Sequence, residues 1–202
     1  MQSFAIIPAA GRSTRMGRPK LLLPWGSSTI VETVLTTWRA SGVTASIVTV
    51  HPADVELAEL CRRGGADVVV ANEPPADMKA SVALALAHVE SIYRPQPSDA
   101  WLLAPADMPT IGTDVIGELL RQFAADPTRA VLPVHAGRRG HPVILPWAWA
   151  GEVQRLGPHE GIRAFFARHW LDELPWPDEK ILEDVDSPEN YRHLRNRYGP
   201  ND

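Results

Sequence analysis

The chain has 202 residues, of which 45% are hydrophobic and 22% are charged, and it carries a net charge of -4 at pH 7. These values are ordinary for one globular domain, and the acidic balance argues against a nucleic-acid-binding protein, which would usually show a basic face. Cys61 is the only cysteine and no apolar run approaches the roughly 20 residues of a membrane helix, so an intramolecular disulfide, a cysteine-rich metal site and a membrane span are excluded.

The first two thirds of the chain alternate between segments with strand character and segments with helix character. Residues 4–9 are apolar on both faces, which is typical of a strand in the centre of a parallel sheet. Apolar spacing then predicts helix 29–40, strand 46–50, helix 53–62, strand 68–71, helix 79–93, strand 100–104, helix 113–123 and strand 130–133. This order predicts an α/β fold with three layers, in which helices cover both faces of a mostly parallel sheet.

The alternation ends after residue 133. We expect a turn at 137–140, a strand at 141–145, a helix at 147–155, a loop at 157–161, a helix at 162–168, short strands at 171–174 and 180–183, and a closing helix at 188–197. Ser187 is suited to cap the closing helix, Pro188 to occupy its first position and Glu189 to complement its dipole.

A glycine-containing loop with several cations follows the first expected strand, over residues 8–20. Small residues let a backbone approach a ligand closely, a curved run of N–H groups can cradle phosphate oxygens, and Arg15 and Lys20 can offset phosphate charge. The spacing is neither that of a Walker A loop nor that of a dinucleotide-binding fingerprint. A strand-to-helix turn with surface arginines is the alternative. The residues expected to hold the phosphates are Ala9, Ala10, Gly11, Arg12, Ser13, Arg15 and Lys20.

Asp107 follows the apolar strand expected at 100–104, between two prolines that stiffen the turn. Ligands of open α/β sheets lie outside the carboxyl ends of the strands, and Mg²⁺ prefers one or two carboxylates together with phosphate oxygens and water. Asp107 is therefore a candidate metal ligand. The alternative is a cap for the helix near Thr113, but Thr113 and Asp114 are better placed to cap it.

A second acidic cluster, residues 184–189, precedes the closing helix. Alternation along an extended segment places Asp184 and Asp186 on the same side. Taken by itself, this cluster also fits a solvated turn and a helix cap.

The string Ala-Ala-Gly-x-Ser-x-Arg-Met-Gly-x-Pro-Lys, read from residue 9, resembles the signature loop of the MobA-like nucleotidyltransferases, which have a Rossmann-like, glycosyltransferase-A-like fold. It is most similar to the molybdenum cofactor cytidylyltransferases and their guanylyltransferase relatives. Ala10, Pro19 and the run Leu-Leu-Leu-Pro at 21–24 favour the cytidylyltransferase branch over the guanylyltransferase branch, so CTP is favoured over GTP.

The resemblance also implies roles for residues elsewhere in the chain. Ala-Asp-Met-Pro at 106–109 resembles the metal-binding element of the family, and Asp184-Val-Asp-Ser-Pro-Glu resembles the element that supplies the second metal contact, without deciding between Asp184 and Asp186. Asn72 and Ser81 fall where relatives read the base and ribose, although Asp77 replaces a glycine there. Gly-His-Pro-Val at 140–143 resembles an acceptor element that contains His141, and Arg138 adds positive charge beside it.

The implied reaction is Mg²⁺-dependent transfer of a nucleoside monophosphate from a nucleoside triphosphate to a phosphorylated acceptor, molybdopterin first, with release of pyrophosphate. Arg15, Lys20 and Asp107 are the expected catalytic residues. We expect one domain over 1–202, with a nucleotide-binding half at 1–133 and an acceptor-binding half at 134–202. A molybdoenzyme or its chaperone is a candidate partner.

Three other assignments stay open at this point: guanylyl transfer, transfer to a phosphosugar or a phospholactate, and a non-catalytic nucleotide-binding module. Met1 leads straight into an apolar segment, without the basic region and long apolar core of a signal peptide, so we expect a cytoplasmic protein that contacts neither membrane nor nucleic acid.

Overall fold

The computed structural model of the chain describes residues 1–11, 16 and 19–199. An eight-stranded sheet has the order β10-β7-β9-β6-β1-β4-β5, with β8 paired to β7. Its strands are β1 (Ser3–Ala9), β4 (Ala45–Val50), β5 (Asp67–Val70), β6 (Ala100–Leu103), β7 (Ala130–His135), β8 (Arg138–Arg139), β9 (Val143–Pro146) and β10 (Leu171–Pro175). A separate short hairpin joins β2 (Pro24–Trp25) to β3 (Ser28–Thr29). Within the described ranges, no helix is long and apolar enough to cross a membrane.

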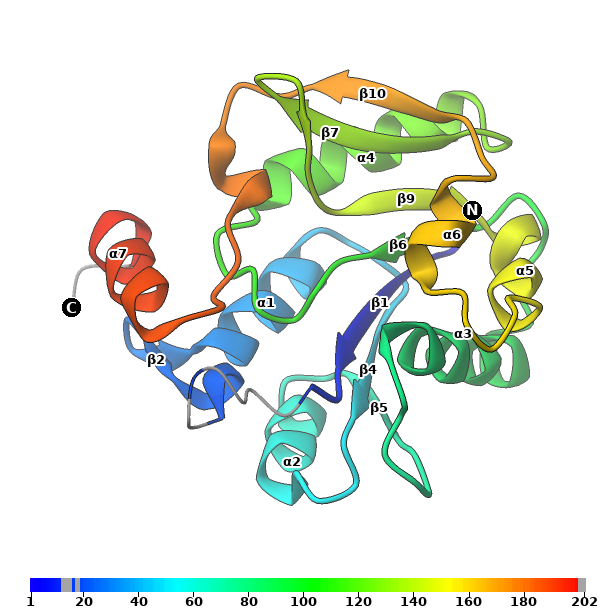
Figure 1. Cartoon of the computed structure of the whole chain (residues 1–202). Coiled ribbons are helices and arrows are strands. Elements are labelled where there is room, and N and C mark those ends of the chain that lie inside the picture. Colours follow the sequence, from blue (N-terminus) through cyan, green and yellow to red (C-terminus); the bar gives the residue numbers. More distant parts are fainter. Residues whose placement is uncertain (12–15, 17–18, 200–202) are drawn as a thin grey trace.

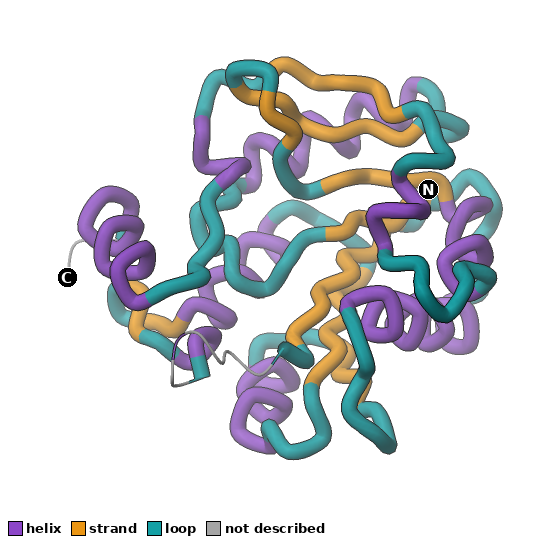
Figure 2. Tube along the Cα trace, viewed as in Figure 1, coloured by secondary structure: helices purple, strands orange, loops and turns teal. Residues whose placement is uncertain are grey.

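Helices cover both faces of this sheet (Figures 1 and 2). They are α1 (Ile30–Ala40), α2 (Val55–Arg63), α3 (Met78–Tyr93), α4 (Thr113–Ala125), α5 (Ala150–Gln154), α6 (Ile162–Phe166) and α7 (Pro188–Tyr198), and the 3-10 turns are η2 (Lys20–Leu22), η3 (Trp147–Trp149) and η4 (Glu179–Leu182). The expected three-layer α/β fold is confirmed.

Strand β1 shows why the sheet is covered on both sides. Its side chains alternate between two buried clusters: Ala5 and Ile7 pack with α1, α2, α4 and α7, whereas Phe4 and Ile6 pack with α3, α5 and α6. A strand in the middle of such a sheet has no solvent face, which is why residues 4–9 are apolar throughout.

The direction of the strands positions the site. β1, β4, β5 and β6 run parallel to one another, while β9 is antiparallel to both β6 and β7. Leu103 at the end of β6 pairs with Val143 at the start of β9. The residues just before β9 therefore lie at the same sheet edge as the residues just after β6.

Helix ends follow the local sequence. Thr29 and Glu32 form a capping box at the start of α1, in which the Glu32 N–H donates to Thr29 Oγ1 at 3.3 Å and the Thr29 N–H donates to Glu32 Oε2 at 2.9 Å. Ser187 caps α7 as expected, accepting from the Asn190 N–H at 3.1 Å. Helix α4 begins at Thr113 as expected, but the expectation that Thr113 or Asp114 caps it was wrong, because Gly112 occupies the cap position without a side-chain bond.

Two other local predictions were also wrong. The turn expected at 137–140 lies earlier, because Ala136 and Gly137 both have positive φ, as two-residue hairpin turns require, and 138–139 already form β8. Residues 180–183 were expected to be a strand but belong to the turn η4 and its cap.

Candidate functional site

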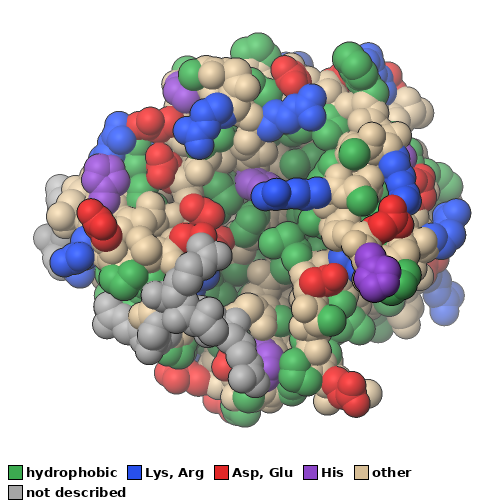
Figure 3. Space-filling view, viewed as in Figure 1, with side chains coloured by type: hydrophobic (Ala, Val, Ile, Leu, Met, Phe, Trp, Pro, Cys, Tyr) green, Lys and Arg blue, Asp and Glu red, His purple; other side chains and the backbone are tan. Residues whose placement is uncertain are grey.

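The candidate site lies at the edge of the sheet where β1, β4 and β6 end and β9 begins. Ala9 ends β1, Asp107 follows β6, His141 precedes β9, and Asp184 follows η4. The face drawn in Figure 3 is hollowed near its centre, with hydrophobic side chains inside the hollow and charged side chains around it.

Lys20 begins η2 and is held there by its neighbours. Leu21 and Leu23 are buried in the core, and the Ile30 N–H donates to the Leu23 carbonyl at 3.0 Å, which ties η2 to the start of α1. Three residues expected to bind phosphate, Arg12, Ser13 and Arg15, lie outside the described residues.

The ammonium of Lys20 contacts two carboxylates from distant parts of the chain. It forms an ion pair with Asp107 and donates to Asp186 Oδ1 at 3.0 Å. Burial by itself would lower the pKa of Lys20, but the two carboxylates outweigh burial and raise it above its usual 10.5. Lys20 is therefore a fixed positive charge at neutral pH.

Three carboxylates gather at this point, those of Asp107, Asp184 and Asp186, with one ligand atom of each within 4.8 Å of the others. Val185, fully buried between the two later aspartates, turns both carboxylates to the same side, and its N–H donates to the Asp107 carbonyl at 2.9 Å. Asp107 Oδ1 is buried and has no hydrogen-bond partner among the described residues. A buried carboxylate oxygen without a donor fits a divalent cation, which prefers such ligands.

Asp184→Asn should change stability and metal binding in opposite directions. Asp184 is exposed as a residue, but the partial burial of its carboxylate in the cluster, followed by the carboxylates of Asp186 and Asp107, raises its pKa. The folded protein thus holds that proton more tightly than the unfolded chain does, so ionised Asp184 destabilises the metal-free fold above this pKa. We expect Asp184→Asn to raise the melting temperature of the metal-free protein at about pH 8 and to weaken Mn²⁺ binding.

Calorimetric melting curves across pH test this expectation. The gain should shrink as the pH falls toward 3.8, the ordinary value for Asp, where the carboxyl group is protonated. A gain that is independent of pH would have another cause than the charge on Asp184.

Next to the carboxylates is a cavity of about 410 Å³ that brings together residues from five separate stretches of the chain. They are Pro8, Ala9, Ala10, Gly11, Lys20, Leu21, His51, Pro74, Pro75, Ala76, Asp77, Met78, Ser81, Pro105, Ala106 and Asp107. We call it the phosphate-side cavity. Among the residues expected to bind nucleotide, Ala9, Ala10, Gly11, Lys20 and Ser81 line it. Asn72 is exposed just beyond β5 and does not line it.

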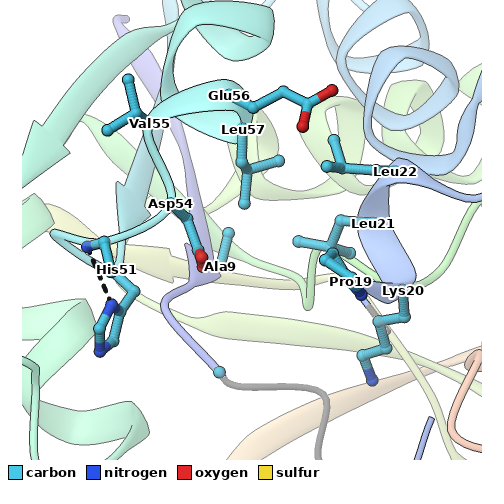
Figure 4. Close-up of a pocket in the computed structure, with 12 residues that line it drawn as sticks. Ala9, Pro19, Lys20, Leu21, Leu22, His51, Asp54, Val55, Glu56 and Leu57 are labelled. Carbon is cyan, nitrogen blue, oxygen red and sulfur yellow. Dashed lines mark hydrogen bonds between the residues drawn. The ribbon is translucent and has the colours of Figure 1, made fainter. Parts of the chain in front are cut away.

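His51 was missed by sequence reasoning. It directly follows β4, is 5% exposed, and lines both the phosphate-side cavity and a neighbouring cavity of about 520 Å³ between η2 and the start of α2 (Figure 4). Its Nδ1 accepts from the Ala53 N–H at 3.1 Å, which leaves the proton of the neutral ring on Nε2. The available signal was its place directly after the strand expected at 46–50, because ligands of open α/β sheets lie outside the carboxyl ends of the strands.

A third cavity, also of about 410 Å³, lies beyond Asp107 and includes His141. We call it the apolar cavity. Its lining is Pro8, Met78, Leu103, Pro105, Leu132, Arg139, Gly140, His141, Val143, Ile162, Arg163, Phe166 and Leu171. Pro8, Met78 and Pro105 also line the phosphate-side cavity, so the two cavities adjoin.

Burial lowers the pKa of His141, while the Leu103 carbonyl and the charge of Asp107 oppose that effect, so the imidazole is neutral at pH 7. Its Nδ1 is buried and finds no hydrogen-bond partner in the described ranges. Arg138, expected here, is exposed and does not line the cavity, whereas its neighbour Arg139 does. Successive side chains of a strand point to opposite sides, which explains the exchange.

Gly140→Ala should disturb both this cavity and the acidic cluster. A Cβ at Gly140 would lie 2.7 Å from the Ile181 carbonyl oxygen, in the turn that leads to Asp184. The backbone must shift, and we expect a loss of about 1–3 kcal/mol of stability, as in other overpacked sites, together with weaker Mn²⁺ binding. Denaturant unfolding and Mn²⁺ titration measure the two effects. Gly117→Ala in α4, where an added Cβ meets nothing within 4 Å, is the control.

Residues 5–174 match the family model of the MobA-like NTP transferase domain. The chain belongs to this family. It is 26% identical over 196 residues to the molybdenum cofactor cytidylyltransferase of Escherichia coli K12, covering 96% of this chain and 95% of that protein. MobA-like proteins are nucleotidyltransferases, and the expectation of such an enzyme is confirmed.

Solved structures of relatives share the fold, and one of them contains manganese. Rv0371c of Mycobacterium tuberculosis H37Rv is 28% identical, with a TM-score of 0.79 over 97% of this chain and 98% of that one. A second structure of that protein is a complex with manganese, with a TM-score of 0.76 and coverage of 97% and 99%. A 4-diphosphocytidyl-2C-methyl-D-erythritol synthase, 16% identical, shares the fold with a TM-score of 0.76 over 96% and 97% of the two chains.

Proposed function

We propose that this MobA-like protein transfers a nucleoside monophosphate, from CTP in preference to GTP, to a phosphorylated acceptor, and that molybdopterin is the first acceptor to consider. The observation that carries the proposal is the contact of Lys20 with Asp107 and Asp186, because Lys20 and Asp107 line the phosphate-side cavity, which adjoins the apolar cavity. One cavity is bordered by the signature loop and suits a triphosphate. The other is the space left for an acceptor.

The reaction forms a bond between an acceptor phosphate oxygen and the α-phosphorus, and breaks the bond from that phosphorus to the bridging oxygen, whose electron pair leaves with pyrophosphate. An acceptor phosphate is already ionised at neutral pH, so the protein mainly positions and neutralises charge. Lys20, held at the cluster, would bind phosphate oxygens on which negative charge develops. Arg15, from the same loop, is proposed to do the same.

Asp107 with Asp184 and Asp186 would hold a divalent cation, for which we propose Mg²⁺. Bound there, Mg²⁺ would supply charge neutralisation for phosphate oxygens. The buried, unpartnered oxygen of Asp107 and the closeness of the three carboxylates support this assignment.

The apolar cavity favours an acceptor with a ring or hydrocarbon body over a phosphosugar. Among the described residues that line it there is no Asp, Glu, Asn, Gln, Ser or Thr, so sugar hydroxyls would find few side-chain acceptors there. Phe166 offers an aromatic face and Arg163 supplies a cation for an anionic group, while the second cation, Arg139, is paired with Glu173 at 3.0 Å. We accordingly propose that residues 134–202 mainly select the acceptor and residues 1–133 the nucleotide, within one domain.

Pyrophosphate release, measured for each of the four nucleoside triphosphates against each candidate acceptor with Mg²⁺, tests the proposal. CTP with molybdopterin should give the highest rate. Turnover with GTP or with a phospholactate would replace the substrate assignment, and triphosphate binding without pyrophosphate release under any combination would identify a non-catalytic module.

A further inference from the structure

One side chain joins the walls of the two cavities. Lys79, in the first turn of α3, donates from Nζ to the Gly157 carbonyl at 2.8 Å, across 78 residues of sequence. Gly157 begins the loop that leads into α6. A charge-assisted bond between these two segments is stronger than a neutral one, because the ammonium polarises the carbonyl.

Lys79 is poorly placed to stabilise its own helix. The N-terminal end of a helix carries a partial positive charge, so a lysine in the first turn is unfavourable there. The end of α3 is already capped by Asp77, whose side chain accepts from the Ala80 N–H at 2.8 Å. The position of Lys79 is therefore better explained by what it reaches than by helix formation.

On the α3 side, the neighbours of Lys79 form a wall of the phosphate-side cavity. Pro74, Pro75, Ala76, Asp77 and Met78 line it, and Ser81 follows one residue after Ala80. Met78, directly before Lys79, also lines the apolar cavity and is 46% exposed. A ligand that orders this wall acts on the residue that carries the ammonium.

On the other side, two contacts of the Glu160 side chain connect Gly157 to the residue segment that contains α6. Glu160 closes the loop: its carboxylate accepts from the Gly157 N–H at 2.7 Å and forms an ion pair with Arg168 beyond α6. Both of these bonds also lower the pKa of Glu160. The carboxylate therefore stays ionised at neutral pH, and its contacts with the Gly157 N–H and Arg168 persist. Ile162, Arg163 and Phe166 of α6 line the apolar cavity.

We propose that Lys79 is a positioning residue that couples the two cavities: a nucleotide bound against residues 74–81 fixes Lys79, and Lys79 fixes Gly157 and α6 for the acceptor. The inference rests on the proposed function, since it takes the phosphate-side cavity as the nucleotide site. By linkage, an acceptor in the apolar cavity must favour nucleotide binding by the same factor.

Hydrogen exchange of the full-length protein, with and without CTP and Mg²⁺, tests the coupling. In the wild type, CTP should slow amide exchange both in residues 74–81 and in residues 157–168. Lys79→Met, which keeps the length of the side chain but removes its donors, should retain protection of 74–81 and lose protection of 157–168. Lys79→Arg, which keeps a donor, should restore it.

The two ways of failing can be told apart. Protection of 157–168 that persists in Lys79→Met, or protection confined to 74–81 in the wild type, overturns the coupling and leaves the proposed function intact. No protection in either segment with any of the four triphosphates overturns the proposed function and the coupling with it. Unliganded melting temperatures of the variants within a few degrees of the wild type show that a lost response is not unfolding.

Discussion

Asp107→Asn should abolish measurable nucleotidyl transfer, a loss of about 10³-fold or more in kcat, because it removes a charge from the centre of the acidic cluster. The amide is nearly the same size as the carboxylate, but it binds a divalent cation more weakly and cannot form the ion pair with Lys20. Mn²⁺ titration followed by electron paramagnetic resonance should show weaker binding, in parallel with the loss of pyrophosphate release.

Asp172→Asn is the matched control. Asp172 lies on the edge strand β10, which pairs with β7, and forms an ion pair with Arg129 at 2.6 Å. It lines none of the three cavities. Its variant should keep full activity. Turnover of Asp107→Asn near that of Asp172→Asn at saturating Mg²⁺ would exclude Asp107 as a metal ligand.

Lys20→Met should lower kcat by about 10²–10³-fold, the range found when one preorganised donor to a developing charge is removed. The fixed ammonium of Lys20 lies 17% exposed beside the carboxylates, so water replaces it poorly. The metal-free protein should also lose stability, since Asp107 and Asp186 would repel each other without the cation between them.

Steady-state kinetics and thermal melting, each with and without Mn²⁺, measure both effects. Mn²⁺ should restore much of the stability of Lys20→Met but not its kcat, because a cation among the carboxylates relieves their repulsion without replacing the donor to phosphate. Lys180→Met removes a surface lysine that pairs with Asp178 and should change neither quantity. An unchanged kcat in Lys20→Met would remove Lys20 from the catalytic group.

The fold was predictable where local pattern and tertiary packing agree. Strand β1, helix α1 and helix α3 were each expected within one residue of their observed ends, because their apolar spacing is also the spacing of their buried faces. The prediction for residues 180–183 failed because Ile181 and Leu182 form a short apolar run between charged residues, which is also compatible with a short strand. The Ile181 carbonyl instead accepts from the His141 N–H at 2.9 Å, and that long-range contact fixes a turn.

The site was predictable where chain direction decides it. Lys20 and Asp107 were expected to meet because both follow parallel strands at one sheet edge, and they do contact each other. The position of a hairpin turn decides which side of the sheet each following side chain points to. Because the turn lies at Ala136 and Gly137, Arg139 rather than Arg138 lines the apolar cavity. Phe166 carried no signal, because the approach of α6 to β9 depends on packing rather than on a local motif.

The reversed strand β9 has an evolutionary consequence. Because β9 runs antiparallel to β6, most of the residues that line the apolar cavity come from the chain after β6, between Pro105 and Leu171. Substitutions and insertions within residues 132–171 can change which acceptor fits, while Lys20, Asp107 and the two later aspartates keep their places. New acceptor specificities would then arise through changes in the wall of the apolar cavity, while the residues that carry out nucleotidyl transfer stay the same.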